Sequence, residues 1–407
     1  MSNSAVMPGY IAERVGRLDG ESAFAILSKA QALEAKGINV VHLEIGQPDF
    51  KTPANIMEAA QKAMSDGYTG YGPTLGYNDL RNAVADYAQK YKNLDVTMEN
   101  VIIVPGGKPT MFFTILTLVR PGDEVIYPNP GFPIYESCIK FAEGVPVPMP
   151  LKAENDFRLD IKKFKSLITP KTKLIVINSP GNPTGGIFEK EDILAMAEVL
   201  KDRPDIFILS DEIYDRLIYD GQPFSIASLP EFKDRTLVLD GFSKTYAMTG
   251  WRVGYCIANP DIIKQFEMIM VNSVSCTCSF TQMAAIEALT GDQEPVDRMK
   301  EEFKKRRDWL VEALNEIDGV TCRMPRGAFY AFPDISSFGL TSKEFADRLL
   351  DEKGVALAWG TSFGKYGEGH IRISYATSLE NLKEAVSRLK RFTEKLREEN
   401  AEIEAVG

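Results

Sequence analysis

The sequence predicts an α/β protein with a large, doubly wound, mostly parallel sheet domain and a smaller α+β domain formed by both chain ends. At 407 residues the chain is too long for a single small domain and long enough for a large core. In its middle, short apolar runs alternate with helical patterns, as they do in doubly wound domains. The last third instead combines long helical patterns with two short strand patterns.

The predicted strands of the large domain are short, nearly continuous runs of β-branched and other apolar residues. Such runs are typical of strands buried on both faces of a parallel sheet. They lie at residues 101–104, 124–127, 174–177, 207–209 and 237–239. Helical patterns at 108–119 and 189–201 lie between them.

The small domain has helix signals and two short strand patterns. Pro295 is expected to open one helix, because proline is favoured in a first turn. Thr377 and Glu380 have the spacing of a capping box, which makes Thr377 the predicted N-cap of the last helix. Strand patterns at 328–332 and 371–374 lie between these helices. The predicted boundaries are 1–48 and 295–407 for the small domain and 49–294 for the large domain.

Charge and cysteine content argue against several kinds of partner. With 47 basic and 57 acidic residues, the net charge of −10 disfavours nucleic acid, because phosphate backbones attract clustered Lys and Arg. The five cysteines are scattered and odd in number, as in reduced cytosolic proteins. Cys276 and Cys278 have no second pair and no nearby histidine, so no metal site is expected. Since no apolar stretch is long enough to cross a bilayer and the N-terminus lacks a signal-peptide pattern, we expect a cytoplasmic protein without a membrane partner.

The run from Gly241 to Arg252 is the most informative part of the sequence. It follows a short apolar strand pattern, so Lys244 is delivered at the carboxyl end of a strand, where open α/β sheets bind ligands. An amine there can form an imine with an aldehyde cofactor, and Ser243 and Arg252 can hold a phosphate. The alternative for Lys244 is a solvated lysine on a surface loop.

Asp211 closes another predicted strand, and Tyr214 follows three residues later. A buried carboxylate is costly unless a cation or hydrogen-bond donors compensate its charge. A protonated pyridine nitrogen about 4 Å away would attract it by about 4 kcal/mol at an effective dielectric constant of about 20, which keeps the ring protonated at neutral pH. The alternative for Asp211 is a helix N-cap. Tyr214 can donate to a phenolate oxygen, or it can simply pack.

Three further strand ends carry candidate ligands. Asn182 lies in a loop rich in proline and glycine that can present its amide to a pocket, and a turn asparagine is the alternative. Gly106 and Gly107 precede a predicted helix, where backbone N–H groups can bind an anion. Phe132 can stack on a cofactor ring or belong to the core.

Arg372 alternates with Ile371 and Ile373 in a predicted strand. An arginine presented from a strand suits bidentate capture of a carboxylate, and a surface ion pair is the alternative. The chain has two histidines, His42 and His370, and neither accompanies a Ser or Cys nucleophile pattern. A hydrolase triad is therefore not supported.

Together these motifs resemble the class I and II aminotransferases of fold type I, the aspartate aminotransferase family of pyridoxal 5'-phosphate enzymes. The motifs are Asp211 to Tyr214, Ser243 and Lys244 with Arg252, Asn182 in its NPTGG loop, and Arg372. The resemblance extends over nearly the whole chain, from residues 45–50 to residues 374–376.

The resemblance implies a role for each residue of the site. Lys244 is expected to bind the cofactor covalently and to shuttle the proton, while Asp211 pairs with the pyridine nitrogen. Tyr214 and Asn182 are expected at the ring oxygen and Phe132 in the stacking position. The implied phosphate ligands are Gly106, Gly107, Lys108, Ser243, Arg252 and, from the neighbouring subunit, Tyr71. The implied substrate ligands are Arg372 and Asn182 at the α-carboxylate, with Gly46 and Lys108. Sites shared in this way imply a homodimer.

The implied reaction is transamination, in which the substrate amine displaces Lys244 and the freed lysine removes the α-proton. We expect aspartate or glutamate as amino donor and 2-oxoglutarate as acceptor. Lys108 would then hold a distal carboxylate, or it is only a solvated lysine. Ala23 and Phe24 depart from the branch with acidic substrates, which leaves aromatic or aliphatic amino acids as an alternative.

Other functions remain open at this stage. A β-lyase or a decarboxylase would use the same Lys244 and Asp211. A ligand-sensing regulator on this fold would need an additional DNA-binding domain, for which the chain has no room. A noncatalytic scaffold protein would leave the full set of cofactor contacts unexplained.

Overall fold

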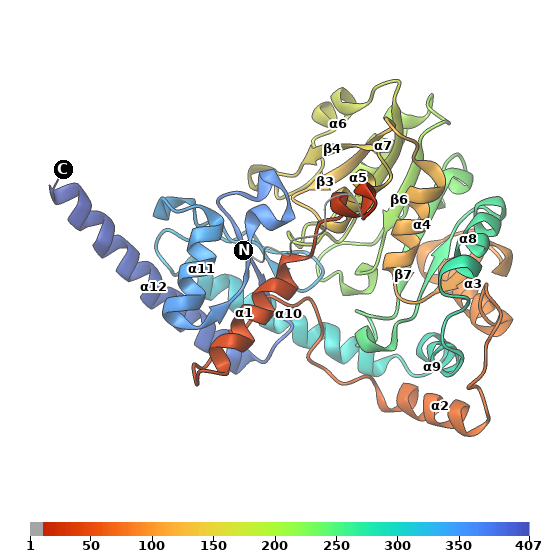
Figure 1. The fold of residues 1–407 in the computed structure, drawn as a ribbon, viewed down its shortest axis with the longest axis horizontal. Coiled ribbons are helices and arrows are strands. Elements are labelled where there is room, and N and C mark those ends of the chain that lie inside the picture. Colours follow the sequence, from red (N-terminus) through yellow and green to blue (C-terminus); the bar gives the residue numbers. More distant parts are fainter. Residues whose placement is uncertain (1–10, 407) are drawn as a thin grey trace.

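The chain, in a computed structural model that describes residues 11–406, is built around a seven-stranded sheet (Figure 1). The strand order is β2-β8-β7-β6-β5-β3-β4. β8 pairs antiparallel with β2 and β7, and all the other pairings are parallel. The strands are β2 (Val101–Val104), β3 (Glu124–Asn129), β4 (Val145–Pro150), β5 (Thr172–Asn178), β6 (Phe207–Asp211), β7 (Thr236–Gly241) and β8 (Gly254–Ile257).

Helices cover both faces of this sheet, which confirms the predicted doubly wound α/β class. In β5, Leu174 and Val176 belong to the core on one face, and Ile175 and Ile177 to the core on the other. The first face packs against α4 (Lys108–Leu118), α5 (Ile134–Phe141) and α8 (Pro260–Ser273). The second packs against α2 (Ala54–Ser65), α3 (Asn78–Lys92), α6 (Ile161–Leu167), α7 (Lys190–Leu200) and α9 (Ser279–Thr290).

Every predicted strand of the large sheet is present, but the sequence did not reveal β4 and β8. β4 has proline at every second position and lies at the edge of the sheet, where a missing N–H group is tolerated. β8 has four residues and begins at Gly254, where an added Cβ would lie 2.9 Å from the Gly106 carbonyl carbon. Close backbone approach therefore explains a glycine in this strand.

A smaller α+β part packs around a second, three-stranded antiparallel sheet of order β11-β12-β9. Its strands are β9 (Tyr330–Ala331), β11 (Ala358–Trp359) and β12 (Ile371–Ser374). Its helices are α1 (Ser22–Glu34), α10 (Glu294–Asn315), α11 (Ser342–Lys353) and α12 (Leu379–Val406). β1 (Val41–His42) pairs in parallel with β10 (Val355–Ala356), which joins the two chain ends.

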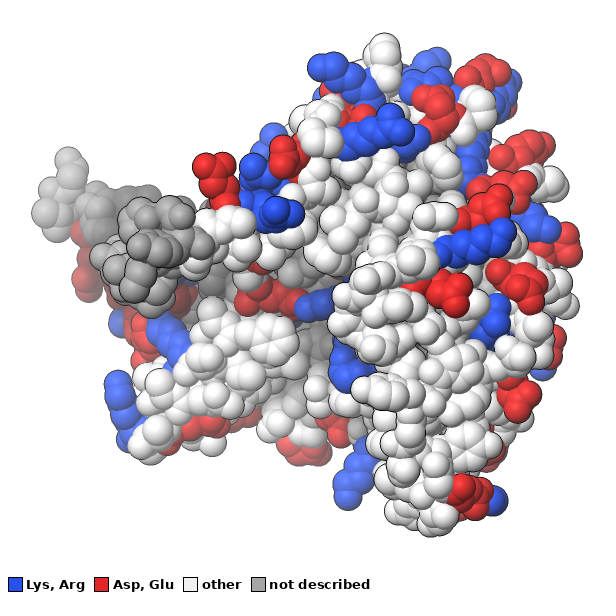
Figure 2. All heavy atoms as spheres, turned by 45° about the vertical axis from the view of Figure 1, so that its right-hand side comes forward, with Lys and Arg blue, Asp and Glu red and all other residues white. Residues whose placement is uncertain are grey.

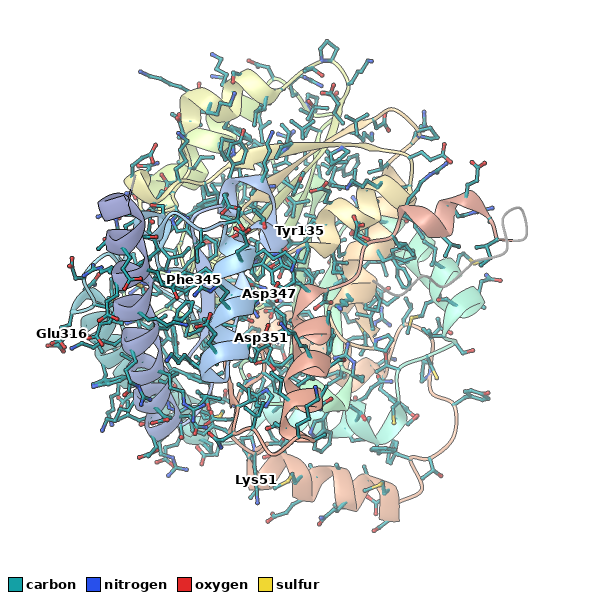
Figure 3. All side chains as sticks on the ribbon, turned by 60° about the vertical axis from the view of Figure 1, so that its left-hand side comes forward. Lys51, Tyr135, Glu316, Phe345, Asp347 and Asp351 are labelled. Atoms are coloured by element: carbon teal, nitrogen blue, oxygen red, sulfur yellow. The ribbon has the colours of Figure 1, made fainter. Side chains whose placement is uncertain are left out.

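Contacts between α1 and α11 reinforce this joining of the chain ends. Lys29 of α1 forms ion pairs with Asp347 at 3.3 Å and Asp351 at 2.9 Å, and Figure 3 shows both aspartates on α11 beside α1. The small part thus combines segments from the N-terminal and C-terminal portions of the described chain, as predicted. The domain boundaries given above remain predictions.

The helix signals of the last third were right in one case and wrong in the other. Pro295 lies in the first turn of α10, which begins at Glu294. The capping box at Thr377 and Glu380 was wrong, because α12 begins at Leu379. The Ser378 Oγ atom accepts a hydrogen bond from the Asn381 N–H at 3.1 Å, so Ser378 provides the cap. The Ser378 hydroxyl, one residue after Thr377, thus accepts from one of the free N–H groups at the start of α12.

Within residues 11–406, no helix combines the length and the apolar composition that a membrane crossing requires. The five cysteines are free thiols.

Candidate active site

A cavity of about 600 Å³ lies where the carboxyl ends of the large-sheet strands face the small α+β part. Most of the predicted site residues line it, although they are far apart in the sequence. These are Gly46, Gly107, Lys108, Phe132, Asn182, Asp211, Tyr214, Ser243, Lys244, Arg252 and Arg372. Gly106 lies directly behind the wall, and Tyr71 does not line the cavity.

Lys244 is the amine of this cavity. It follows β7 by three residues, and its Nζ atom donates a hydrogen bond to the Gly46 carbonyl oxygen at 2.5 Å. Burial lowers the pKa of the Lys244 amine to about 8, with further lowering by the charges of Arg372, Arg252 and Lys108. An amine with this pKa is partly neutral near neutral pH, which makes it both a nucleophile and a base.

Asp211, the last residue of β6, is a buried carboxylate that lines the same cavity. It is only 7% exposed, and burial raises its pKa to about 6. Tyr135 donates its hydroxyl to Asp211 Oδ2 at 2.5 Å, and the Ile213 N–H donates to Oδ1 at 3.3 Å. The helix N-cap alternative does not hold, since the next helical turn begins only at Asp215. Asp211 therefore points into the cavity as an acid that a cationic ligand would keep ionised.

Arg372 of β12 is buried and has incomplete hydrogen bonding. Its Nη1 donates to Asn182 Oδ1 at 3.1 Å, and its Nη2 donates to the Glu44 carbonyl oxygen. Its Nε is buried and has no hydrogen-bond partner among residues 11–406. The guanidinium lies over the Tyr330 ring, 4.5 Å from the centroid. A buried guanidinium with a free donor is suited to an anion such as a carboxylate.

Tyr214 and Tyr330 form a hydroxyl pair on the wall of the cavity. Their oxygen atoms are 2.9 Å apart, and burial raises the pKa of Tyr214 well above its ordinary value. The ring of Tyr214 also packs edge to face against Phe329, so packing and hydrogen bonding both apply to it. An added Cβ at Gly46 would lie 2.1 Å from the Tyr330 hydroxyl, which explains why glycine is needed there.

A site for an oxyanion lies at the N-terminus of α4. Gly106, with φ of +85°, and Gly107 bring the chain into the helix without a side-chain cap. Pro109 has no N–H and the Thr110 N–H donates to the Gly107 carbonyl oxygen at 3.1 Å, so the N–H groups of Gly107 and Lys108 are the ones that can face a ligand. Arg252 reaches the same place, because an added Cβ at Gly106 would lie 2.0 Å from its Nη2. Ser243 lines the cavity nearby. Backbone donors, a hydroxyl and a guanidinium together suit a phosphate.

Two predicted residues have surroundings that the sequence did not suggest. Lys108 forms an ion pair with Glu21, a residue of the N-terminal segment that also lines the cavity. Its Nζ lies 5.7 Å from the centroid of the Phe132 ring. Tyr71 is 93% exposed and lies at the surface of the described chain.

Three side chains that line the cavity were not predicted from the sequence: Tyr135, Tyr330 and Glu21. Tyr135 lies in the first turn of α5, Tyr330 lies in the two-residue strand β9, and Glu21 precedes α1. None of the three directly follows a strand of the large sheet, and a position directly after a predicted strand was the pattern that indicated most of the other site residues. The position of Tyr135 three residues after Phe132 was the one available hint.

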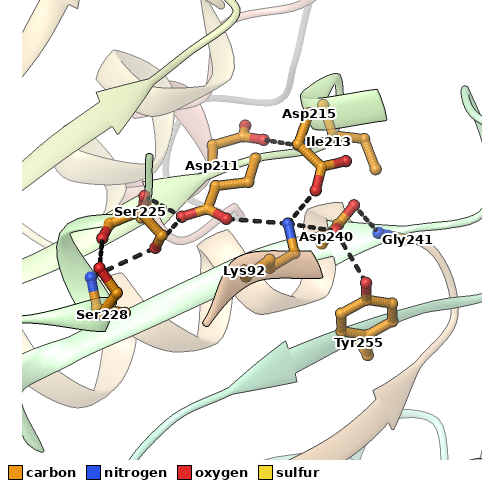
Figure 4. Close-up of polar contacts among 12 residues, drawn as sticks. Lys92, Asp211, Ile213, Asp215, Ser225, Ser228, Asp240, Gly241 and Tyr255 are labelled. Carbon is orange, nitrogen blue, oxygen red and sulfur yellow. Dashed lines mark hydrogen bonds and ion pairs between the residues drawn. The ribbon is translucent and has the colours of Figure 1, made fainter. Parts of the chain in front are cut away.

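A buried ion cluster lies behind the site (Figure 4). The Lys92 amine contacts Glu212 at 2.9 Å, Asp240 at 3.0 Å and Asp215. Glu212 and Asp215 follow β6, and Asp240 belongs to β7. The cluster therefore connects the ends of the two strands that deliver Asp211 and Lys244.

The chain is similar to known aminotransferases in sequence and in overall structure. The family model for aminotransferases of class I and II matches residues 38–389. The chain is 40% identical over 389 residues to an aspartate aminotransferase of Pyrococcus horikoshii, covering 95% of this chain and 97% of that protein. It is 36% identical over 385 residues to aromatic-amino-acid aminotransferase 2 of Thermococcus litoralis, covering 94% and 97%. The solved structure of Thermus thermophilus aspartate aminotransferase with maleate has a TM-score of 0.90 and 37% identity, covering 94% of this chain and 99% of that chain.

Proposed function

This chain belongs to the class I and II aminotransferase family, and from that premise we propose that it is a pyridoxal 5'-phosphate-dependent enzyme acting on aspartate and glutamate. It would pass the amino group to a 2-oxo acid such as 2-oxoglutarate. The observation that supports this proposal best is one cavity that contains the low-pKa amine of Lys244, the buried acid Asp211 and the free donor of Arg372.

The residues present fit the cofactor. Gly106 leaves room for Arg252 beside the uncapped start of α4, which suits the phosphate, and the Ser243 hydroxyl with the backbone N–H groups of Gly107 and Lys108 would complete its surroundings. Asp211 would pair with the ring nitrogen, since a cation beside a buried acid with a pKa of about 6 keeps it ionised. The remaining assignments are Tyr214 and Asn182 at the ring oxygen and Phe132 against the ring face. Bound there, pyridoxal phosphate supplies an aldehyde for the amino group and a ring that accepts the electron pair of the broken Cα–H bond.

The side chains of the protein position the substrate and move its proton. Arg372 binds the α-carboxylate, and the Asn182 amide, already bonded to its guanidinium, assists. The Lys244 Nζ removes the proton from the substrate Cα, a task for which a pKa of about 8 is well matched near neutral pH. Tyr135 holds the Asp211 carboxylate in place through its hydroxyl.

Reduction of the holoenzyme with borohydride tests the assignment of Lys244. We expect the yellow cofactor to become attached irreversibly to Lys244, identified by peptide mass spectrometry. Attachment at any other lysine refutes the assignment.

The choice of acidic substrates is supported by the second cationic end of the cavity, Lys108, and by the similarity to aspartate aminotransferases. Aromatic or aliphatic amino acids are the alternative, because Ala23 and Phe24 line the same end and one relative is an aromatic-amino-acid aminotransferase. A panel of amino donors with 2-oxoglutarate separates these substrates. Formation of pyruvate and ammonia without an acceptor would instead indicate a β-lyase, and loss of carbon dioxide a decarboxylase.

We also propose a homodimer with shared active sites. Tyr71 extends into solvent, where it is free to reach the phosphate of a second copy. Met268 and Val271 of α8 are 59% and 50% exposed, and Figure 2 shows a broad expanse of uncharged surface on the side of the molecule that carries α8. Mixing inactive Tyr71→Ala and Lys244→Ala variants should restore activity, because one site of each mixed dimer is then intact. A monomer would regain none.

The five free thiols support a reducing compartment, and we propose a cytoplasmic location on that ground. Fractionation of the source cells tests it, and recovery of the protein outside the cytoplasm contradicts it.

A further inference from the structure

Glu21 occupies a position in the cavity that the proposed reaction does not explain. It directly precedes α1, yet its side chain makes no capping hydrogen bond with that helix. Instead it reaches across the cavity to the Lys108 amine at the start of α4. The Glu21 side chain is 17% exposed and that of Lys108 51%, so the carboxylate is the more enclosed partner.

The charges of the cavity wall show why this contact matters. Its cations are Lys108, Lys244, Arg252 and Arg372, and its carboxylates are Asp211 and Glu21. Asp211 is bonded to Tyr135 on another side of the cavity. Glu21 is therefore the acidic group at the Lys108 end, and its charge also acts on Lys244, Arg372 and Tyr330.

A dicarboxylic substrate needs two cations. If Arg372 takes the α-carboxylate while Lys244 and Arg252 serve the cofactor, Lys108 is the remaining cation of the wall for the distal carboxylate. Lys108 is already paired with Glu21, and two carboxylates at one amine repel each other. A distal carboxylate at Lys108 would therefore be bound more weakly for as long as Glu21 holds that amine.

An uncharged substrate side chain does not need a second cation. The pair of Glu21 and Lys108 can stay closed, and Phe24 and Phe132 on the same wall offer apolar contacts. One cavity can thus accept both substrate classes, in two arrangements of the same ion pair.

We propose that Glu21 competes with the distal carboxylate of dicarboxylic substrates for Lys108, and so sets the preference of the enzyme between dicarboxylic and uncharged amino acids. This inference rests on the proposed function, because it assumes that Arg372 holds the α-carboxylate. Glu21 is a specificity-determining residue in this scheme and takes no part in proton transfer.

Binding of unreactive analogues to the holoenzyme tests the competition directly by titration calorimetry. Maleate represents the dicarboxylic class and 3-phenylpropionate the uncharged class. Glu21→Gln should bind maleate about fivefold more tightly, the range expected for loss of a partly exposed ionic competitor, and should bind 3-phenylpropionate unchanged. Lys108→Met should weaken maleate binding, and adding Glu21→Gln to Lys108→Met should restore nothing.

Asp19→Asn is the matched control. It removes the same charge two residues away on the same segment, but the Asp19 side chain pairs with Lys140 at 3.4 Å outside the cavity. Its maleate affinity should equal that of the wild type. A gain in Asp19→Asn as large as that in Glu21→Gln would mean a general charge effect and would overturn the proposal.

Other outcomes distinguish a failure of the Glu21 competition from a failure of the proposed function. If the wild type transaminates aspartate but Glu21→Gln binds maleate no more tightly, the competition is refuted and the proposed function stands. If Glu21→Gln specifically loses activity toward lysine or ornithine, Glu21 binds the side-chain ammonium group of the substrate and the proposal is wrong. If the wild type transaminates no amino acid and binds neither analogue, the proposed function fails and the inference fails with it.

Discussion

The lowered pKa of Lys244 predicts an unusual pH profile for its reactivity. Only the neutral amine reacts, and a pKa of about 8 makes about one tenth of it neutral at pH 7, about half at pH 8 and about nine tenths at pH 9. Labelling of Lys244 should therefore rise about fivefold from pH 7 to pH 8, less than twofold from pH 8 to pH 9, and level off above that. An ordinary lysine, with a pKa near 10.4, gains about tenfold per pH unit over the same range.

Competitive labelling of the apoenzyme with a trace of acetic anhydride measures this profile. The Lys244 peptide is quantified by mass spectrometry at each pH and compared with the Lys62 peptide. Lys62 is a useful reference because its hydrogen bond to Asp66 raises its pKa above the ordinary value, so its labelling should still climb at pH 10.

Two variants change the profile in opposite directions. The Arg372 charge lowers the pKa of Lys244 and the Glu21 charge raises it. Arg372→Met should therefore move the midpoint to higher pH, and Glu21→Gln should move it to lower pH. A Lys244 profile that keeps rising at pH 10 together with that of Lys62 would refute the reasoning, because burial would then not favour the neutral amine.

Three further predictions concern single substitutions. Arg372→Ala should weaken amino-acid binding about a hundredfold, as expected for loss of a charged bidentate contact, and leave cofactor retention near the wild-type level; equal losses in titrations of both ligands would move Arg372 out of the substrate site. Gly106→Ala should do the reverse, because its Cβ would lie 2.0 Å from Arg252 Nη2, and dialysis should remove the cofactor about tenfold faster while KM changes little. Asp240→Asn should change how stability depends on pH. Burial raises the pKa of Asp240 to about 7, so between pH 4 and pH 7 the folded state retains a proton that the unfolded state has lost, and the free energy of unfolding falls as pH rises. Urea unfolding of Asp240→Asn should lack that decline.

The sequence predicted the large sheet well where a strand is apolar along its whole length. The run 174–177 needs no knowledge of its neighbours, because both of its faces are buried. β4 was not predicted, because its alternating prolines argue against a strand unless its position at the edge of the sheet is known. β8 was not predicted, because it has only four residues and begins with a glycine. The need for that glycine becomes clear only from the Gly106 backbone that lies beside it.

The same reasoning separates the predicted from the unpredicted parts of the site. Asp211 and Lys244 follow strands, and the ends of parallel strands meet at one edge of the sheet, so their proximity follows from the chain order alone. Tyr135, Tyr330 and Glu21 reach the cavity from a helix, a two-residue strand and a connecting segment. The positions of Tyr330 and Glu21 depend on how the small α+β part packs on the large sheet, and that of Tyr135 depends on how α5 packs on this sheet. No local pattern encodes either packing.

The ion cluster around Lys92 explains how Asp211 and Lys244, which are delivered by different strands, can contact one ligand. Asp211 ends β6 and Lys244 follows β7, and the Lys92 amine bonds to carboxylates that belong to both strand ends. A buried charge cluster of this kind stabilises a fold no more than well-packed apolar residues would, but its members must stay together, because separation leaves a buried charge uncompensated. Tyr255 donates to Asp240 at 2.8 Å from β8, which extends the same constraint to a third strand. The separation of the acid and the amine is thus set by the sheet itself, whereas Glu21 comes to the substrate end from a segment outside the sheet.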